Sequence, residues 1–157
     1  MLGDLEPAWI DGLAEIDLPK LGVRGNHDEP DALASVGAED LHLRQVELGG
    51  LGFAGFGGSP RYSPRGGNQW TEAEADEMLE RLPGADVLLV HSPPEGVNDE
   101  PDDRAHRGSA ALRAWVERHQ PAWLLHGHTL PNPVRQVHRL GPTQVIHVRG
   151  AVPIELG

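Results

Sequence analysis

The sequence lacks cysteine, an excess of basic side chains and any long hydrophobic run, and each absence excludes a class of function. Without cysteine neither disulfides nor thiolate chemistry is available, so a metal site would have to use His, Asp, Glu or Asn. The formal net charge of -11 argues against nucleic acid or an anionic membrane as the main partner, because both bind patches of Lys and Arg. A phosphate group could bind only where a local positive charge, such as a metal ion, overrides this field.

The most apolar runs, such as Val87 to Val90, are far too short to cross a bilayer. The start of the sequence, Met1 to Asp4, has neither a basic region nor an apolar stretch, so no signal peptide is expected. We therefore expect a soluble, cytoplasmic protein. A length of 157 residues predicts one domain over residues 1–157.

The pattern of apolar residues predicts that helices alternate with strands in the first part of the chain and that short strands finish it. Helices are expected over residues 6–16, 29–36, 75–82 and 109–119, and strands over residues 18–24, 41–48, 51–56, 85–90, 121–125, 134–138, 144–148 and 152–156. Gly49-Gly50 predicts a hairpin turn, and residues 71–74 predict a helix cap. The order suits a layered α/β domain with polar residues at the carboxyl ends of its parallel strands.

Histidine, carboxylate and amide side chains follow several of these apolar runs. They are Asp4, Asn26-His27-Asp28, His91 and His126-Gly127-His128. Because strand ends converge at one edge of an α/β sheet, these distant segments are expected to form one pocket. A mixture of oxygen and imidazole ligands suits Mn²⁺, Fe or Zn²⁺. Gly25 and Gly127 are expected to permit the backbone bends that aim the ligands.

Each segment alone also has an ordinary structural explanation. Asp4 could be a surface charge, His91 could cap a strand end, and residues 25–28 could form a turn. Two histidines flanking a glycine at a strand end are harder to explain by packing. The occurrence of all four segments in order favours a functional site.

The four segments resemble the ordered motifs of the calcineurin-like metallophosphoesterases. In that family the motifs are Asp-x-His, Gly-Asp-x-x-Asp, Gly-Asn-His-Asp/Glu, an isolated His after a strand, and Gly-His-x-His. The matching residues here are Gly3-Asp4, Gly25-Asn26-His27-Asp28, His91 and Gly127-His128. The resemblance covers essentially the whole chain, including the loops at residues 57–60 and 96–99. It implies a layered αββα sandwich of two mixed sheets flanked by helices, without the family's first strand.

The resemblance also implies roles for individual residues. The metal ligands would be Asp4, Asn26, His91 and His128, with Asp4 bridging two ions. His27 is similar to the family's histidine that contacts the scissile phosphate and protonates the leaving oxygen. Asp28, His106 and His126 are further candidates for substrate or supporting contacts. Glu6 or Asp28 would orient His27, whereas His106 could equally belong to a solvated acidic loop over residues 92–107.

Three positions depart from the family pattern. No Asp-x-His precedes Asp4, Leu130 replaces the last His of Gly-His-x-His, and Pro7 replaces the last carboxylate of Gly-Asp-x-x-Asp. The first two affect the same ion, so one complete and one missing or impaired metal site are expected, unless His126 or His138 substitutes. Without the Asp-x-His segment, an unpaired apolar strand edge is expected, and we expect a homodimer that covers this edge.

Two functions of different classes are consistent with these residues. The first is metal-dependent hydrolysis of a phosphomonoester or phosphodiester, with His27 as proton donor and weak turnover because ligands of the first metal are missing. The second is a non-catalytic metal- or phosphate-binding homologue that retains the fold. A purely structural α/β domain, binding no metal, is a third.

Overall fold

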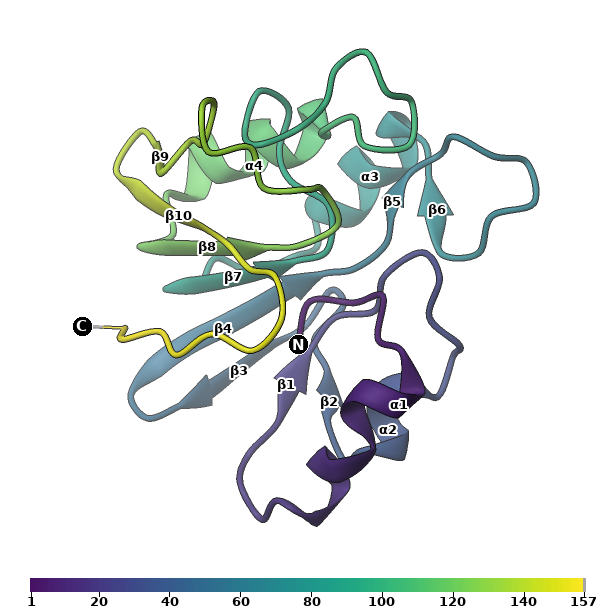
Figure 1. Cartoon of the computed structure of the whole chain (residues 1–157). Helices are drawn as coiled ribbons and strands as arrows, with labels where there is room; N and C mark the ends of the chain where they lie inside the picture. The colour runs from purple at the N-terminus through teal and green to yellow at the C-terminus, as the bar shows by residue number, and fades with distance from the viewer. Residues whose placement is uncertain (157) are drawn as a thin grey trace.

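A six-stranded mixed sheet forms the centre of the computed structural model, which describes residues 1–156 (Figure 1). In spatial order its strands are β3 (Gln45–Leu48), β4 (Leu51–Phe56), β7 (Val87–Val90), β8 (Trp123–His126), β10 (Thr143–His147) and β9 (Arg139–Leu140). The four inner strands run parallel, and the two edge strands are antiparallel to their neighbours. The central strand β7 is buried along its whole length, as its continuous apolar run predicts for a strand covered on both faces.

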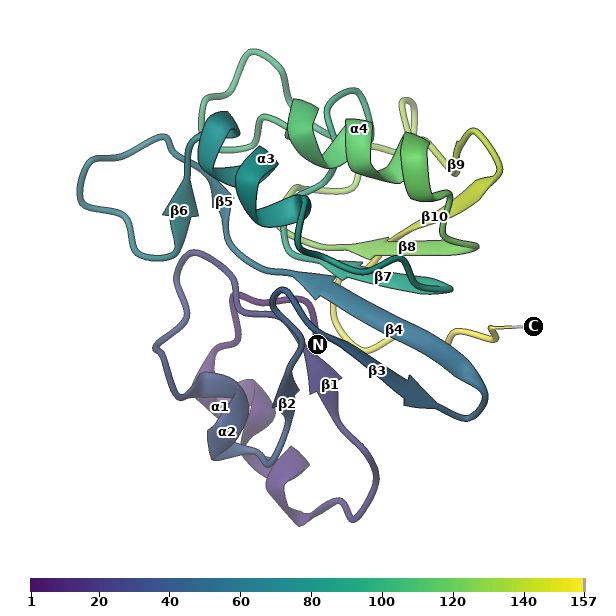
Figure 2. The same ribbon diagram turned by 180° about the vertical axis from the view of Figure 1, so that it is seen from behind.

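Two helices, α3 (Glu72–Leu79) and α4 (Ala110–His119), cover one face of this sheet (Figure 2). Thr71 and Glu74 form the predicted capping box at the start of α3, and Ser109 caps α4 by accepting the amide hydrogen of Leu112. The apolar core beneath them includes Phe56, Leu79, Leu88, Leu112, Trp115 and Leu124.

The opposite face packs against a small parallel sheet of β1 (Leu21–Gly22) and β2 (Glu39–Asp40). The second core, between the two sheets, consists of Val23, Leu41, Val87, Leu89 and Leu125. Outside the small sheet lie α1 (Pro7–Ile10), the 3₁₀ helix η1 (Asp11–Glu15) and α2 (Ala32–Ser35), with a third core of Ile10, Leu33, Val36 and Ala38. Three cores separate four layers, so the expected αββα arrangement is confirmed.

The expected hairpin over residues 41–56 is confirmed, because β3 and β4 pair across Gly49-Gly50. The loop after β4 also holds a short parallel pair, β5 (Ser59–Pro60) with β6 (Gln69–Trp70). The helix expected over residues 6–16 is wrong in its length, since one α-helical turn passes into a 3₁₀ helix that contains Gly12.

Two expected strands do not form. Over residues 134–138 the backbone of Val137 pairs with the side chain of Asn98, which donates to the Val137 carbonyl at 3.1 Å and accepts its amide at 2.6 Å. Residues 152–156 contain Pro153, which has no amide hydrogen, and Ile154 packs on the second core without strand pairing. None of the helices within residues 1–156 has both the length and the apolar character needed to span a bilayer.

Candidate metal centre

Asp4, His91 and His128 converge at one edge of the molecule, each offering a ligand atom within 4.8 Å of the others. Asp4 precedes α1, His91 directly follows β7, and His128 lies two residues after β8. Asn26 joins them, because its Oδ1 lies 3.1 Å from His91 Nε2. The structure therefore brings together all four ligands expected from the sequence, and we call these four residues the metal centre.

The backbone at the metal centre adopts unusual conformations. Asp4 has φ 52° and His128 has φ 65°, the left-handed region that side chains other than glycine rarely occupy. Such strain persists only where surrounding contacts impose it, and it is typical of functional sites. The expectation that Gly127 supplies this bend is wrong: its φ lies outside the left-handed region, and a Cβ there would meet nothing nearer than the Leu2 carbonyl at 3.5 Å.

Gly25 likewise has no left-handed φ, so the expected bend is wrong for it too, but this glycine is required for space. A Cβ at Gly25 would collide with the backbone and carboxylate of Asp4 and with the ring of His91. Gly3 faces Gly25 across the same gap, and a Cβ on Gly3 would collide with the Gly25 backbone. The two glycines let the segment before α1 and the loop after β1 approach closely, which places Asp4 beside Asn26.

The hydrogen bonds of His91 show that the metal centre is suited to a cation. His91 Nδ1 lies 2.7 Å from the Leu2 carbonyl oxygen, which can only accept, so Nδ1 carries the proton. Burial lowers the pKa of His91, although the Asp4 carboxylate acts to raise it, and the neutral ring leaves a lone pair on Nε2. That lone pair faces Asn26 Oδ1 at 3.1 Å and Asp4 Oδ1 at 3.5 Å. None of these three atoms donates to another, although Asp4 Oδ1 also accepts the backbone amide of His27 at 3.1 Å. A divalent cation between them would satisfy all three.

His128 is held in a matching way. Its Nε2 donates to the Ala105 carbonyl oxygen at 2.7 Å, so Nδ1 keeps the lone pair. Burial, followed by the neighbouring His91, lowers the pKa of His128 to about 4. Both imidazoles are therefore neutral at neutral pH, the form in which histidine binds metals, and each has its second nitrogen fixed by a backbone carbonyl.

Asp28 supports the metal centre through the backbone. Its carboxylate accepts the amide hydrogens of Asp4 at 2.9 Å, Leu5 at 2.6 Å and Gly25 at 2.6 Å. The expectation that Glu6 or Asp28 orients the ring of His27 is wrong, because within residues 1–156 the hydrogen-bond partner of this ring is the hydroxyl of Tyr62, 3.4 Å from Nε2. His27 itself is exposed, and its backbone amide donates to Asp4 Oδ1 at 3.1 Å.

His126 is fully buried and forms hydrogen bonds outside the metal centre. Its Nε2 accepts from Asn98 Nδ2 at 2.9 Å, its Nδ1 donates to the Gly127 carbonyl at 3.2 Å, and its ring stacks on His147. Burial, followed by the charge of His147, lowers the pKa of His126 to about 3. With both nitrogens occupied, His126 fixes the Asn98 loop and cannot replace a missing metal ligand.

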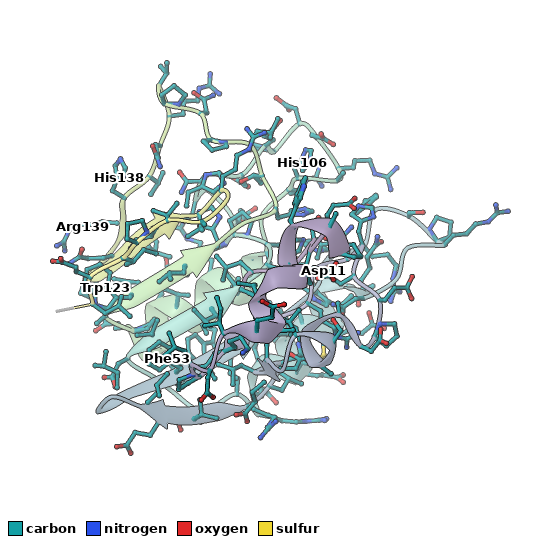
Figure 3. The ribbon with its side chains drawn as sticks, turned by 60° about the horizontal axis from the view of Figure 1, so that its bottom comes forward. Asp11, Phe53, His106, Trp123, His138 and Arg139 are labelled. Carbon is teal, nitrogen blue, oxygen red and sulfur yellow. The ribbon has the colours of Figure 1, made fainter. Side chains whose placement is uncertain are left out.

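His106 and His138 differ in their distance from the metal centre. The ring centroid of His106 lies 5.3 Å from that of His128, and Asp103 holds it through a contact of 2.8 Å to Nδ1. In Figure 3 His138 lies next to Arg139, well apart from His106, and it is exposed. A substrate contact by His106 stays a prediction, whereas His138 is too remote to substitute for a ligand.

Leu130 offers no ligand atom and is 59% exposed. The one Asp-x-His triplet in the sequence, Asp40-Leu41-His42, is used structurally: Asp40 pairs with Arg24 at 3.1 Å. His42 Nδ1 accepts the Gly57 amide at 3.0 Å. Neither feature supplies ligands for a second ion.

Sequence reasoning assigned no role to two residues that organise the surroundings, Tyr62 and Asn98, although the resemblance included the loop over residues 96–99. Both lie in loops without a metal-ligand pattern, and their partners are distant in sequence. Asn98 has φ 54°, but no sequence signal distinguishes it from an ordinary turn asparagine.

The model of one protein family, the calcineurin-like phosphoesterases, matches residues 2–132. One solved crystal structure is similar with a TM-score of 0.65 and 21% identity, covering 88% of this chain and 60% of the other. The crystal structure of TT1561 of Thermus thermophilus is similar with a TM-score of 0.59 and 21% identity, covering 88% of this chain and 66% of its own. This chain therefore spans less than two thirds of either, and the likeness concerns the fold. Comparison with curated proteins found no match.

Proposed function

The chain belongs to the calcineurin-like phosphoesterase family, and on this premise we propose that it is a metal-dependent phosphoesterase acting on a phosphomonoester or phosphodiester. The observation that carries the proposal is the convergence of the His91 Nε2 lone pair with two oxygens that cannot donate to it. Facing acceptors repel one another unless a proton, a water molecule or a cation lies against them, and this set of one carboxylate, one amide oxygen and imidazoles is a typical metal-ligand set. Burial disfavours the proton on His91, so a cation is the better partner.

The metal centre would hold a divalent ion through one carboxylate, one amide oxygen and two imidazoles. This donor set suits Mn²⁺, Fe or Zn²⁺ better than Ca²⁺ or Mg²⁺, which prefer oxygen ligands alone. When bound, such an ion neutralises phosphoryl charge and favours formation of a hydroxide nucleophile at neutral pH. The protein contributes a strained, preorganised backbone around Asp4 and His128.

His27 is the proposed proton donor to the leaving oxygen. Its backbone amide is held by Asp4 Oδ1 at 3.1 Å, which keeps it beside the metal centre, and its ring remains accessible to a substrate. An imidazole at such a position can protonate an alkoxide as it departs.

We propose that turnover is weak, because only one group in residues 1–156 matches the ligand pattern of the family. A second group that could hold an ion, Glu100, Asp103 and His106, has both carboxylates exposed and matches none of the family's motifs. Leu130 stands where the family pattern has a histidine and has no atom that binds a metal. A second ion normally clamps the oxygens of the reacting phosphate, so its loss removes a large part of the catalysis. The same observation favours the alternative function, a metal- or phosphate-binding homologue that does not hydrolyse.

Metal binding and hydrolysis should be measured on the same preparation. Calorimetric titration with Mn²⁺ and Zn²⁺ should show one site, abolished in His91→Ala and unchanged in His138→Ala, a control histidine that is exposed. Hydrolysis of nitrophenyl phosphate and bis(nitrophenyl) phosphate should be slow, metal-dependent and further reduced in His27→Ala.

The outcomes separate the two functions. Stoichiometric metal binding with no difference in hydrolysis between wild type and His27→Ala would support the binding protein and exclude the enzyme. Absence of metal binding by the wild type would exclude both.

A further inference from the structure

The hydroxyl of Tyr62 lies between two residues of the proposed active site. It is 2.9 Å from Asn26 Nδ2 and 3.4 Å from His27 Nε2. Tyr62 is the single tyrosine of the sequence and is half-buried. It comes from the loop between β5 and β6, so it reaches a metal ligand from 36 residues away.

The loop holds Tyr62 in place through hydrogen bonds from its backbone to the side chain of Gln69. Gln69, at the start of β6, accepts the amide hydrogens of Tyr62 and Ser63 on its Oε1, each at 3.2 Å. Gln69 is itself paired with Ser59 in the parallel β5–β6 ladder. The hydroxyl position is therefore set by secondary structure rather than by the metal centre alone.

We propose that Tyr62 is a positioning residue for the metal centre, because its hydroxyl accepts the Asn26 amide N–H and thereby turns Asn26 Oδ1 toward the cation. This inference rests on the proposed function in assuming a cation at that place. Tyr62 would act through Asn26 and His27 and not by touching the ion.

The number of hydrogen-bond donors around Asn26 decides which way its amide faces. The two ends of an Asn side chain have almost the same shape, so hydrogen-bond partners decide which end faces which neighbour. A tyrosine hydroxyl has one proton. When His27 carries its proton on Nδ1, where it stays available to a leaving oxygen, Nε2 accepts the hydroxyl proton, and only lone pairs remain for Asn26. The NH₂ group must then face Tyr62, and the oxygen must face His91 and Asp4.

Loss of the hydroxyl would remove this preference. Asn26 is 5% exposed, so its NH₂ group would lack both Tyr62 and water. The amide could then rotate and present N–H to the cation, which repels it. Changes to residues that orient a metal ligand weaken metal affinity by about 10- to 100-fold.

The test compares Tyr62→Phe with wild type and with Ser63→Ala. The control removes the hydroxyl of the neighbouring residue, which within residues 1–156 takes part in one hydrogen bond, accepting the backbone amide of the exposed Arg65 at 3.3 Å. Titration with Zn²⁺ by calorimetry should show affinity lowered about 10- to 100-fold in Tyr62→Phe and unchanged in Ser63→Ala. The unfolding temperature of the metal-free protein should be nearly the same for all three, because the rotated Asn26 amide can donate to the His91 Nε2 lone pair when no ion is bound. If the Tyr62 hydroxyl had a purely structural role, its removal would lower that temperature.

A second measurement uses the wild-type chain alone. Labelling tyrosine with ¹³C at the ring carbon that carries the hydroxyl gives one NMR signal, because there is one tyrosine. This signal should shift as Zn²⁺ is added and saturate at the calorimetric stoichiometry.

Three results would overturn the inference. Zn²⁺ binding by wild type without a shift of the tyrosine signal would exclude contact between Tyr62 and the ligands. Equal Zn²⁺ affinities of wild type and Tyr62→Phe would exclude positioning while leaving the proposed function intact. Failure of the wild type to bind any divalent ion would reject the proposed function, and the inference with it.

Discussion

At the scale of single residues, the close approach of two backbone segments decides which substitutions the metal centre tolerates. Gly25 faces Asp4 and His91 where a Cβ would collide with both, whereas a Cβ on Gly127 would make only ordinary van der Waals contacts. Each glycine directly precedes an expected ligand in the sequence, Asn26 or His128. Their tolerance of a side chain therefore depends on the atoms around them and not on their position in a motif.

Gly25→Ala should therefore impair the protein in two ways. Overpacking at such a contact costs about 1–3 kcal/mol of unfolding free energy, and displacement of the Asp4 carboxylate should abolish metal binding. Gly127→Ala is the matched control and should change neither quantity. Urea unfolding and calorimetric titration with Mn²⁺ measure the two effects. Equal behaviour of the two variants would contradict the geometry described for Gly25.

Asp28→Ala should destabilise the fold and weaken the metal centre. Three backbone amides lose their acceptor, and hydrogen bonds to charged groups are each worth about 1.5–3 kcal/mol. Because some amides can turn to water, we expect a total loss of about 2–4 kcal/mol. Asp31→Ala is the control, since its exposed side chain makes no cap bond to α2. If urea unfolding gave the same stability for both variants, the Asp28 carboxylate would not be what joins residues 4–5 to the loop at Gly25.

At the scale of elements, α3 illustrates how a short helix is fixed by its first turn. The Thr71 side chain accepts the Glu74 amide at 3.2 Å, and the Glu74 carboxylate accepts the Thr71 amide at 2.7 Å. These bonds to Thr71, first from its backbone and then from its side chain, lower the pKa of Glu74 below its ordinary value of 4.5. The helix then packs against α4, where the Glu72 carboxylate accepts the Ser109 hydroxyl at 3.0 Å.

The capping box predicts a pH dependence of stability. Because the folded pKa of Glu74 is depressed, its contribution is fully present above the unfolded value near 4.5. It is lost as the pH falls through the folded pKa. The stability difference between wild type and Glu74→Gln should therefore be largest at neutral pH and shrink in acid.

Urea unfolding at several pH values tests this expectation. Glu77→Gln is the control, because it removes a carboxylate from an exposed position of the same helix that takes no part in the cap. A difference between wild type and Glu74→Gln that stays constant from neutral to acid pH would contradict the linkage.

At the scale of the whole molecule, the homodimer expected from the sequence stays a prediction. Trp9, Ile16 and Leu18 are exposed large hydrophobic side chains close together in sequence around α1 and η1, and such surfaces favour association. Next to β1, the Met1 carbonyl oxygen accepts the Val23 amide hydrogen at 3.1 Å. Part of the expected open strand edge is therefore already paired.

Static light scattering at micromolar concentration should give about twice the chain mass of 17.0 kDa if copies associate as two-fold dimers. Leu18→Glu should shift the mass toward that of one chain. A single-chain mass for the wild type would rule out the dimer.

The sequence by itself determined the layers and the candidate ligands. Continuous apolar runs marked β7 and β8, a glycine pair marked the β3–β4 hairpin, and the order of four polar segments marked Asp4, Asn26, His91 and His128. Such signals are local, since each depends on the burial of its own segment, and parallel strands bring their carboxyl ends together in any α/β sheet.

Only the tertiary structure decided which nitrogen of each histidine can bind and which neighbours hold the ligands. The Leu2 carbonyl fixes His91 from 89 residues away, Asn98 binds His126 across 28 residues, and Tyr62 meets Asn26 across 36. Periodicity and motif spacing report burial along one segment and contain no information on contacts between loops. The partner of a ring nitrogen or an amide depends on where those loops pack, so it follows from the completed fold.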